Sequence, residues 1–308
     1  MRKFGLSFIA AASMMVFAAC GESEEESSAE NASEDAGETT QNEEAADNES
    51  AKDEVIEIGV TPWTSTVPPT EIATIILEDM GYEVEQTQAD VGGVFTGLSS
   101  GDLDVFMDGW FPMHNTYMEE YGDSLDETAV SYPEAEVGWV VPEYMEDINS
   151  LEDLKGNEDQ FENEMYAIEE GAEATETSRN MVENYDLNME VVASSEGGMM
   201  AEASRKIQQE QPVVFYGWRP HPMFNDYDLK VLEDPDNFFE TSEVKVITNA
   251  DFQDKAPEAY EFLSNWSIDI ADVEQMIVEI EENNKDAEEV AQEWIDNNQD
   301  KVDSMTGE

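Results

Sequence analysis

The chain contains the stretch Val105-Phe106-Met107-Asp108-Gly109-Trp110-Phe111-Pro112-Met113-His114 and a second copy of its pattern, Val213-Val214-Phe215-Tyr216-Gly217-Trp218-Arg219-Pro220-His221. Each copy is an apolar run, then Gly-Trp-x-Pro, then one of the chain's only two histidines. The apolar run predicts a buried parallel strand, which the proline ends because it has no N–H to donate. Each tryptophan is then expected at the carboxyl end of a strand, where open α/β sheets bind ligands. The alternative is that both tryptophans are core residues and that the likeness arises by chance.

A third tryptophan follows the first predicted strand. Residues 54–61 have strand composition and lead into Pro62 and Trp63. A helix over 70–80 ends at Gly81, and a strand over 82–87, a helix over 91–100 and a strand over 105–108 follow. This β-α-β-α-β order predicts a parallel sheet with right-handed crossovers.

The rest of the chain repeats the alternation. An apolar strand over 137–141 ends at Pro142, after which we expect the chain to leave its first lobe. Strands over 165–168, 189–193 and 213–216 alternate with helices over 175–185 and 197–209. A strand over 243–248 is expected to return to the first lobe, before helices over 256–264, 270–281 and 287–297. Trp266 and Trp294 are interpreted as packing residues, and Trp139 as core or hinge.

The length after residue 54, about 255 residues, suits two lobes rather than one core. We expect lobe 1 to comprise 55–143 and 243–308, and lobe 2 to comprise 144–242. Each lobe is predicted to be a mostly parallel sheet flanked by helices, an α/β fold.

The N-terminus has the features of a targeting segment. Arg2 and Lys3 precede an apolar run that is too short to span a bilayer as a mature helix. Residues 1–19 are predicted to be a signal peptide cleaved before Cys20, the only cysteine, with lipid attached to that residue; the alternative is an ordinary signal with an incidental cysteine. Residues 20–54, rich in Glu, Ser and Ala, are predicted to form a disordered acidic tether.

The formal net charge of −62, from 75 acidic and 13 basic residues, is extreme. It excludes nucleic acid as a partner, because phosphate binding needs Lys and Arg, and it disfavours adsorption to anionic lipid. The charge is spread along the chain, which indicates a solvated surface adapted to concentrated salt. The alternative is a merely acidic secreted protein.

Tryptophans at strand ends in two lobes indicate a site for a cation, since indole faces attract positive charge. A quaternary ammonium has no N–H to satisfy, so a wall of indoles suffices. His114 and the backbone N–H groups of Glu173 and Ala174, where a helix begins after Gly171, suit a carboxylate. The predicted ligand is therefore a small zwitterion. A purely structural role remains the alternative for His114, and more so for His221.

These residues resemble a known family, the glycine betaine substrate-binding proteins of ABC importers for compatible solutes. The likeness covers roughly residues 56–298, and its specific stretches are 59–63, 101–110, 138–142 and 217–224. It implies a two-lobed, type II periplasmic-binding-protein-like fold with the ligand in the cleft. The implied site has Trp63, Trp110 and Trp218 as an aromatic cage and His114 with the amides of Glu173 and Ala174 at the carboxylate, with Gly171 and His221 as secondary candidates.

The resemblance also implies a function: a bacterial receptor, lipid-anchored on the extracytoplasmic face of the membrane, that delivers glycine betaine or proline betaine to permease subunits for osmoprotection. It implies neither catalysis nor a cofactor. One departure stands at Glu169-Glu170-Gly171-Ala172-Glu173, where many members have a glycine-rich turn. We expect these acidic side chains to point to solvent, since a helix N-terminus itself favours negative charge.

Two alternatives to this function remain open. The first is a choline or carnitine receptor of the same fold. The second is a metal-dependent enzyme that uses His114 and His221 with acids such as Asp108, although two histidines and no cysteine in the folded part make a sparse zinc site.

Overall fold

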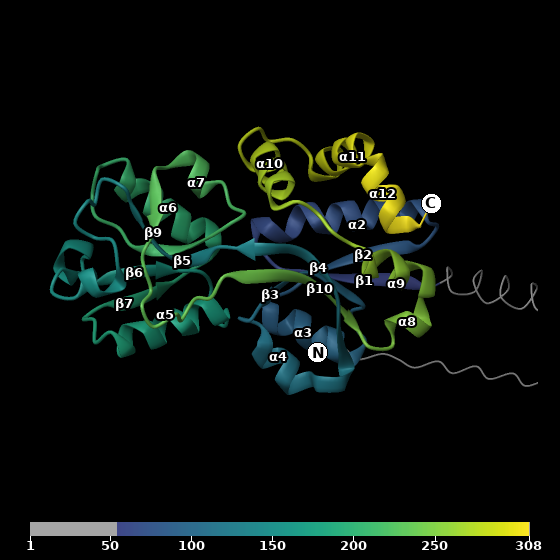
Figure 1. The fold of residues 1–308 in the computed structure, drawn as a ribbon, viewed down its shortest axis with the longest axis horizontal. Coiled ribbons are helices and arrows are strands. Elements are labelled where there is room, and N and C mark those ends of the chain that lie inside the picture. Colours follow the sequence, from purple (N-terminus) through teal and green to yellow (C-terminus); the bar gives the residue numbers. More distant parts are fainter. Residues whose placement is uncertain (1–53, 308) are drawn as a thin grey trace, which may run out of the picture. The chain divides into compact units, whose positions relative to one another are not determined.

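The structure, a computed structural model, describes residues 54–307. Two five-stranded sheets flanked by helices make up this part of the chain, with strand orders β2-β1-β3-β10-β4 and β7-β6-β8-β5-β9 (Figure 1). The predicted two-lobed α/β fold is therefore confirmed. The signal peptide, the lipid attachment at Cys20 and the acidic tether lie outside the described residues, apart from Glu54.

The first sheet begins as the sequence predicts. β1 (Val55–Val60), β2 (Glu83–Gln88) and β3 (Val105–Phe111) are parallel, and α2 (Val67–Asp79) and α3 (Val91–Ser100) connect them. Two prolines stand in the first turn of α2, where a missing N–H costs nothing. The Asp90 side chain caps α3 at the Gly93 N–H, and Gly101 ends it at φ 77°, a conformation that favours glycine.

The other half of this sheet is antiparallel. β10 (Ser242–Asn249) pairs with β3 on one side and with β4 (Leu125–Ala135) on the other. We did not predict β4, whose eleven residues mix polar and apolar side chains and are partly exposed. Its hydrogen bonds to β10, rather than apolar periodicity, define it as a strand.

The second sheet is built in the same mixed way. β6 (Glu164–Ala167) is parallel to β7 (Glu190–Ala193) and β8 (Phe215–Trp218), whereas β5 (Val137–Pro142) is antiparallel to β8 and β9 (Leu229–Val231). Both sheets are thus mixed rather than mostly parallel. The expectation that the chain leaves its first lobe after Pro142 is wrong, because β5 already pairs within the second sheet.

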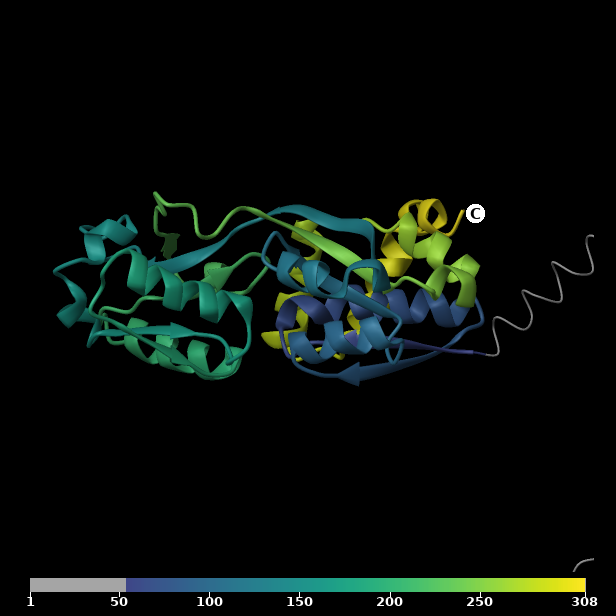
Figure 2. The same ribbon diagram turned by 90° about the horizontal axis from the view of Figure 1, so that it is seen from below.

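The crossing between the sheets therefore occurs at Glu136, the single residue between β4 and β5. The returning segment is β10, which pairs with β4 along most of its length. Figures 1 and 2 show the teal β4–β5 segment and the green β10 segment side by side as they run between the sheets. The chain thus crosses between the lobes twice, at Glu136 and in the segment that leads from β9 into β10.

Helices cover both faces of each sheet (Figure 1). α2, α10 and α11 pack together on one face of the first sheet, whereas α3 and α4 lie on the other. α5 and α6 lie on opposite faces of the second sheet. The remaining helices are α4 (Asn115–Tyr121), α5 (Glu173–Asn184), α6 (Glu196–Ile207), α7 (Met223–Asp226), α8 (Phe252–Lys255), α9 (Pro257–Ser264), α10 (Ile270–Glu281), α11 (Ala287–Asn297) and α12 (Gln299–Thr306), with 3-10 turns η1 (Thr64–Thr66), η2 (Gly122–Ser124), η3 (Leu151–Leu154) and η4 (Glu158–Phe161).

Three of the six tryptophans serve packing, as predicted. Trp139, Trp266 and Trp294 are buried, and their indole N–H groups donate within the protein to Ser178, Ser131 and Asp272. Within residues 54–307, no helix combines the length and the apolar character needed to cross a membrane.

Candidate functional site

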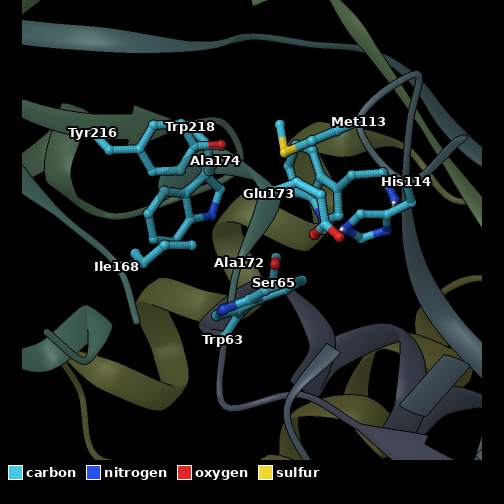
Figure 3. A pocket seen from close by; sticks show the side chains of 11 residues that line it. Trp63, Ser65, Met113, His114, Ile168, Ala172, Glu173, Ala174, Tyr216 and Trp218 are labelled. Carbon is cyan, nitrogen blue, oxygen red and sulfur yellow. Dashed lines mark hydrogen bonds and ion pairs between the residues drawn. The ribbon is translucent and has the colours of Figure 1, made fainter. Parts of the chain in front are cut away.

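A pocket lies where the two lobes face each other, and it gathers the three tryptophans predicted for the site (Figure 3). The first lobe supplies residues of η1 and of the segment from β3 to α4. The second lobe supplies the start of α5 and the end of β8. The lining residues are Trp63, Ser65, Trp110, Met113, His114, Ile168, Ala172, Glu173, Ala174, Tyr216 and Trp218.

A buried carboxylate underlies the first-lobe side of this pocket. Asp108 accepts hydrogen bonds from the hydroxyls of Ser65 and Thr66, each at 2.8 Å, and from the indole of Trp110. Asp108 and Trp110 are two residues apart on β3, so their side chains share one face of the strand. Burial raises the pKa of Asp108, and these hydrogen bonds act in the opposite direction. Asp108 therefore fixes both η1 and the Trp110 ring.

The second-lobe side is formed by two aromatic residues of β8. Trp218 is 4% exposed, and its ring stacks on that of Tyr216 at 5.4 Å between centroids and 27° between planes. We did not predict Tyr216 as a site residue, although it lines the pocket. The i, i+2 spacing from Trp218 places both side chains on the same face of β8, so strand alternation could have identified it.

His114 is held in one tautomer. Its Nδ1 accepts the backbone N–H of Trp110 at 3.0 Å, so the ring proton of the neutral imidazole is on Nε2. The ring is 1% exposed, and it packs against Trp63, Phe95 and Tyr117. Burial lowers the pKa of His114 to about 3, so the side chain is neutral at physiological pH. His114 therefore presents a neutral N–H donor at the pocket.

The start of α5 faces this donor. The N–H groups of Thr175 and Glu176 donate to the Ala172 carbonyl at 3.0 and 3.2 Å. Those of Glu173 and Ala174, the first two residues of the helix, have no earlier helical carbonyl to reach. The structure thus brings both predicted amides into the pocket lining, whereas Gly171 lies in the preceding turn at φ 91° and does not line the pocket.

The acidic side chains of this turn do not all point to solvent as we expected. Glu170 is exposed and pairs with Arg179. Glu173 instead turns into the pocket, where its Oε2 lies 3.8 Å from His114 Nε2 and has no hydrogen-bond partner among the described residues. Burial raises the pKa of Glu173, and a hydrogen bond from Tyr117 opposes that effect. Glu169 accepts the indole N–H of Trp63 at 2.8 Å. Sequence reasoning could not assign these side-chain directions.

His221 lies behind the pocket rather than in its lining. Its Nδ1 accepts the Met223 N–H at 2.9 Å, and its Nε2 lies 3.2 Å from Oε1 of Glu196. The other oxygen of Glu196 accepts the backbone N–H of Thr64, in the first lobe, at 3.1 Å. His221 therefore positions a carboxylate that connects the two lobes.

The arrangement suits a small cation with a polar end. Indole and phenol rings from both lobes line the pocket, and the N–H donors of His114 and of the start of α5 line it as well. Among residues 54–307, no three His, Cys, Asp or Glu side chains are grouped as metal ligands.

Comparisons with known proteins agree with this geometry. A family model described as the substrate binding domain of ABC-type glycine betaine transport system matches residues 54–297. The glycine betaine/carnitine transport binding protein GbuC of Listeria monocytogenes serotype 1/2a (strain 10403S) is 32% identical over 143 residues, 45% of this chain. That match spans 47% of GbuC, about half of its length.

Two solved structures are similar over more of the chain. Lactococcal OpuAC, in a closed conformation complexed with glycine betaine, is 32% identical with a TM-score of 0.77, covering 82% of this chain and 99% of OpuAC. An ABC-transporter choline binding protein in complex with choline is 27% identical with a TM-score of 0.79, covering 84% of this chain and 93% of that protein.

Proposed function

Because this chain belongs to the family of substrate-binding domains of ABC-type glycine betaine transport systems, we propose that it captures a small quaternary ammonium zwitterion, glycine betaine or proline betaine, and delivers it to the permease subunits of an importer. The observation that carries this proposal is the convergence of Trp63, Trp110 and Trp218, from both lobes, on one pocket.

The cage would hold the trimethylammonium group. Each cation–π contact contributes roughly 0.5–2 kcal/mol, and the contributions are not additive. A micromolar Kd corresponds to about −8 kcal/mol, so a second group must contribute.

The other end of the ligand would meet His114 and α5. His114 Nε2–H and the N–H groups of Glu173 and Ala174 are donors, and the helix dipole adds positive potential at the same place. A carboxylate fits this donor set, which supports a betaine. In this proposal His221 and Gly171 act indirectly, through Glu196 and through the turn before α5.

Choline is a second candidate, and one observation favours it. His114 Nε2 and Glu173 Oε2 lie 3.8 Å apart as a donor and an acceptor. A choline hydroxyl beside this pair could donate to Glu173 Oε2, which has no hydrogen-bond partner among the described residues. A similar protein, the ABC-transporter choline binding protein, was solved in complex with choline, which supports this alternative.

We also propose where the protein works and how it moves. Substrate-binding proteins of ABC importers act outside the cytoplasm, and a lipid on Cys20 would anchor this one, with residues 20–54 as its tether. The lobes would open and close about the paired crossings at Glu136 and Thr241, residues 54–135 and 242–307 forming one lobe and 137–240 the other. The protein would bind its ligand without chemical change.

Calorimetry with a matched set of ligands tests this function. Glycine betaine, proline betaine, carnitine, choline and glycine would be titrated into residues 54–308, produced without the N-terminal segment and called the soluble body below. We expect glycine betaine to bind and glycine to fail, because the glycine ammonium needs acceptors that indole faces do not provide. Trp218→Ala should weaken betaine binding roughly 2- to 30-fold, as expected for loss of one cation–π partner. Equal binding of glycine and glycine betaine would contradict the proposal.

A further inference from the structure

Glu173 occupies the end of the pocket that the proposed function assigns to the ligand carboxylate. Its side chain is 17% exposed, and its Oε2 is fully shielded from solvent without a hydrogen-bond partner among residues 54–307. The residue lines the same pocket as Trp63, Trp110 and Trp218 (Figure 3). A negatively charged ligand group would therefore come close to a second carboxylate.

The surroundings supply no cation to separate these two charges. His114 and Tyr117 face Glu173 from the first lobe, and Glu176 and Glu240 line an adjacent hollow with it. Arg179, the basic residue of α5, is engaged with Glu170 and Glu176. Among the ion pairs of residues 54–307, Glu173 takes part only in the contact with His114.

Two carboxylates at close range in a desolvated site cannot both remain ionised, and they share a proton instead. We infer that Glu173 takes up one proton from solvent when the pocket binds a carboxylate ligand, and that its carboxyl O–H then donates to the ligand alongside His114 Nε2–H. This inference rests on the proposed function and makes Glu173 a specificity-determining residue.

The proton belongs on Glu173 rather than on a neighbour. His114 keeps its neutral form over the physiological range, because burial lowers its pKa to about 3. Burial and the adjacent carboxylate hold the Tyr117 hydroxyl protonated by raising its pKa. Burial shifts the pKa of Glu173 upward, towards the range in which ligand binding completes the protonation.

The protonation state then selects the ligand. Glycine betaine binding would weaken as pH rises, by about tenfold per pH unit above the pKa of Glu173 in the free protein and below its pKa in the complex. Choline carries a hydroxyl that donates to ionised Glu173, so its binding takes up no proton. The ratio of betaine to choline affinity would therefore fall with increasing pH.

Titration calorimetry in buffers of different ionisation enthalpy measures the protons taken up on binding. With glycine betaine near neutral pH we expect uptake of about one proton per site. With choline we expect none. Glu173→Gln should abolish the uptake and make betaine affinity independent of pH, because its amide N–H group donates at every pH. Glu176→Gln, an exposed position on the next turn of α5, is the matched control and should keep the uptake.

The wild-type pH dependence tests the inference even if Glu173→Gln fails to fold. Betaine binding without proton uptake, or with equal pH dependence for betaine and choline, would overturn this inference and leave the proposed function intact. Absence of binding by both ligands would overturn the proposed function and this inference with it. Proton uptake that persists in a folded Glu173→Gln variant would assign the proton elsewhere.

Discussion

The indole Nε1 of Trp63 donates to Oε1 of Glu169 at 2.8 Å, and this hydrogen bond joins a cage residue of the first lobe to the turn before α5 in the second. Trp63 is 7% exposed, and the other oxygen of Glu169 is buried without a partner among the described residues. The contact therefore fixes the orientation of an indole ring and exists only while the lobes are close together.

Replacing Glu169 tests whether this contact supports ligand binding. A hydrogen bond to a charged group contributes about 1.5–3 kcal/mol, so Glu169→Ala should weaken glycine betaine binding by about tenfold or more. Calorimetry on the soluble body measures the effect. Glu170→Ala is the matched control, because Glu170 is exposed and contacts Arg179 instead of the cage. Equal losses in both variants would mean that the charge of the turn matters rather than the bond to Trp63.

His114 should distinguish betaine from choline. We expect His114→Ala to weaken glycine betaine binding markedly, because a buried donor to the ligand carboxylate is lost, with little change for choline. Calorimetry with both ligands provides the comparison. The ring also supports Trp63 and Phe95, so the melting temperature of each variant must be measured first. Equal losses for the two ligands would refute the role of His114 at the carboxylate.

Asp108 should make stability depend on pH in a specific direction. Burial raises its pKa in the folded state, so its stabilising contribution is complete below the unfolded pKa and is lost as pH rises through the folded pKa. Asparagine does not ionise, so the Asp108→Asn variant does not lose this stabilising contribution as pH rises. The free energy of unfolding of the variant relative to wild type should therefore increase as pH rises from acid to neutral.

Urea denaturation in concentrated salt, across about pH 4 to pH 7, measures that difference. Asp108→Asn should at the same time weaken binding of a quaternary ammonium severalfold, because it disturbs the hydrogen bond that fixes the Trp110 ring. A stability difference that does not change with pH would show that Asp108 keeps the same pKa in the folded and unfolded states.

Much of the fold followed from the sequence because its signals are local. Two apolar strands, the alternation over residues 82–87, Gly101 at a helix end and the prolines of α2 predicted the first three strands and their crossovers. β4 was missed because its polar residues are held by pairing with β10, over a hundred residues away. Our assignment of β5 to the first lobe was wrong for a similar reason, since the apolar composition of a strand does not specify which sheet it joins.

The site residues that could be predicted from the sequence are those marked by a local pattern at the end of a strand. The repeated Gly-Trp-x-Pro pattern identified Trp110 and Trp218, and the structure places both in one pocket with Trp63. The direction of Glu173 was not predictable, because it depends on the facing His114 and Tyr117 in the other lobe. Long-range electrostatics of this kind has no local sequence pattern.

The acidic surface predicts that stability depends on salt. The sequence has 75 acidic and only 13 basic residues, which leaves a formal net charge of −62, and several of those bases already form ion pairs such as Lys245–Glu127. At low ionic strength the remaining carboxylates repel each other over distances of about 30 Å, whereas molar salt reduces that range to about 3 Å.

The melting temperature of the soluble body should therefore rise substantially between dilute buffer and molar salt. Sodium chloride and potassium chloride should act alike, because screening depends on ionic strength rather than on a specific ion. Differential scanning calorimetry of residues 54–308 measures the effect, and a melting temperature that stays flat across this range would contradict the interpretation of the surface as adapted to salt.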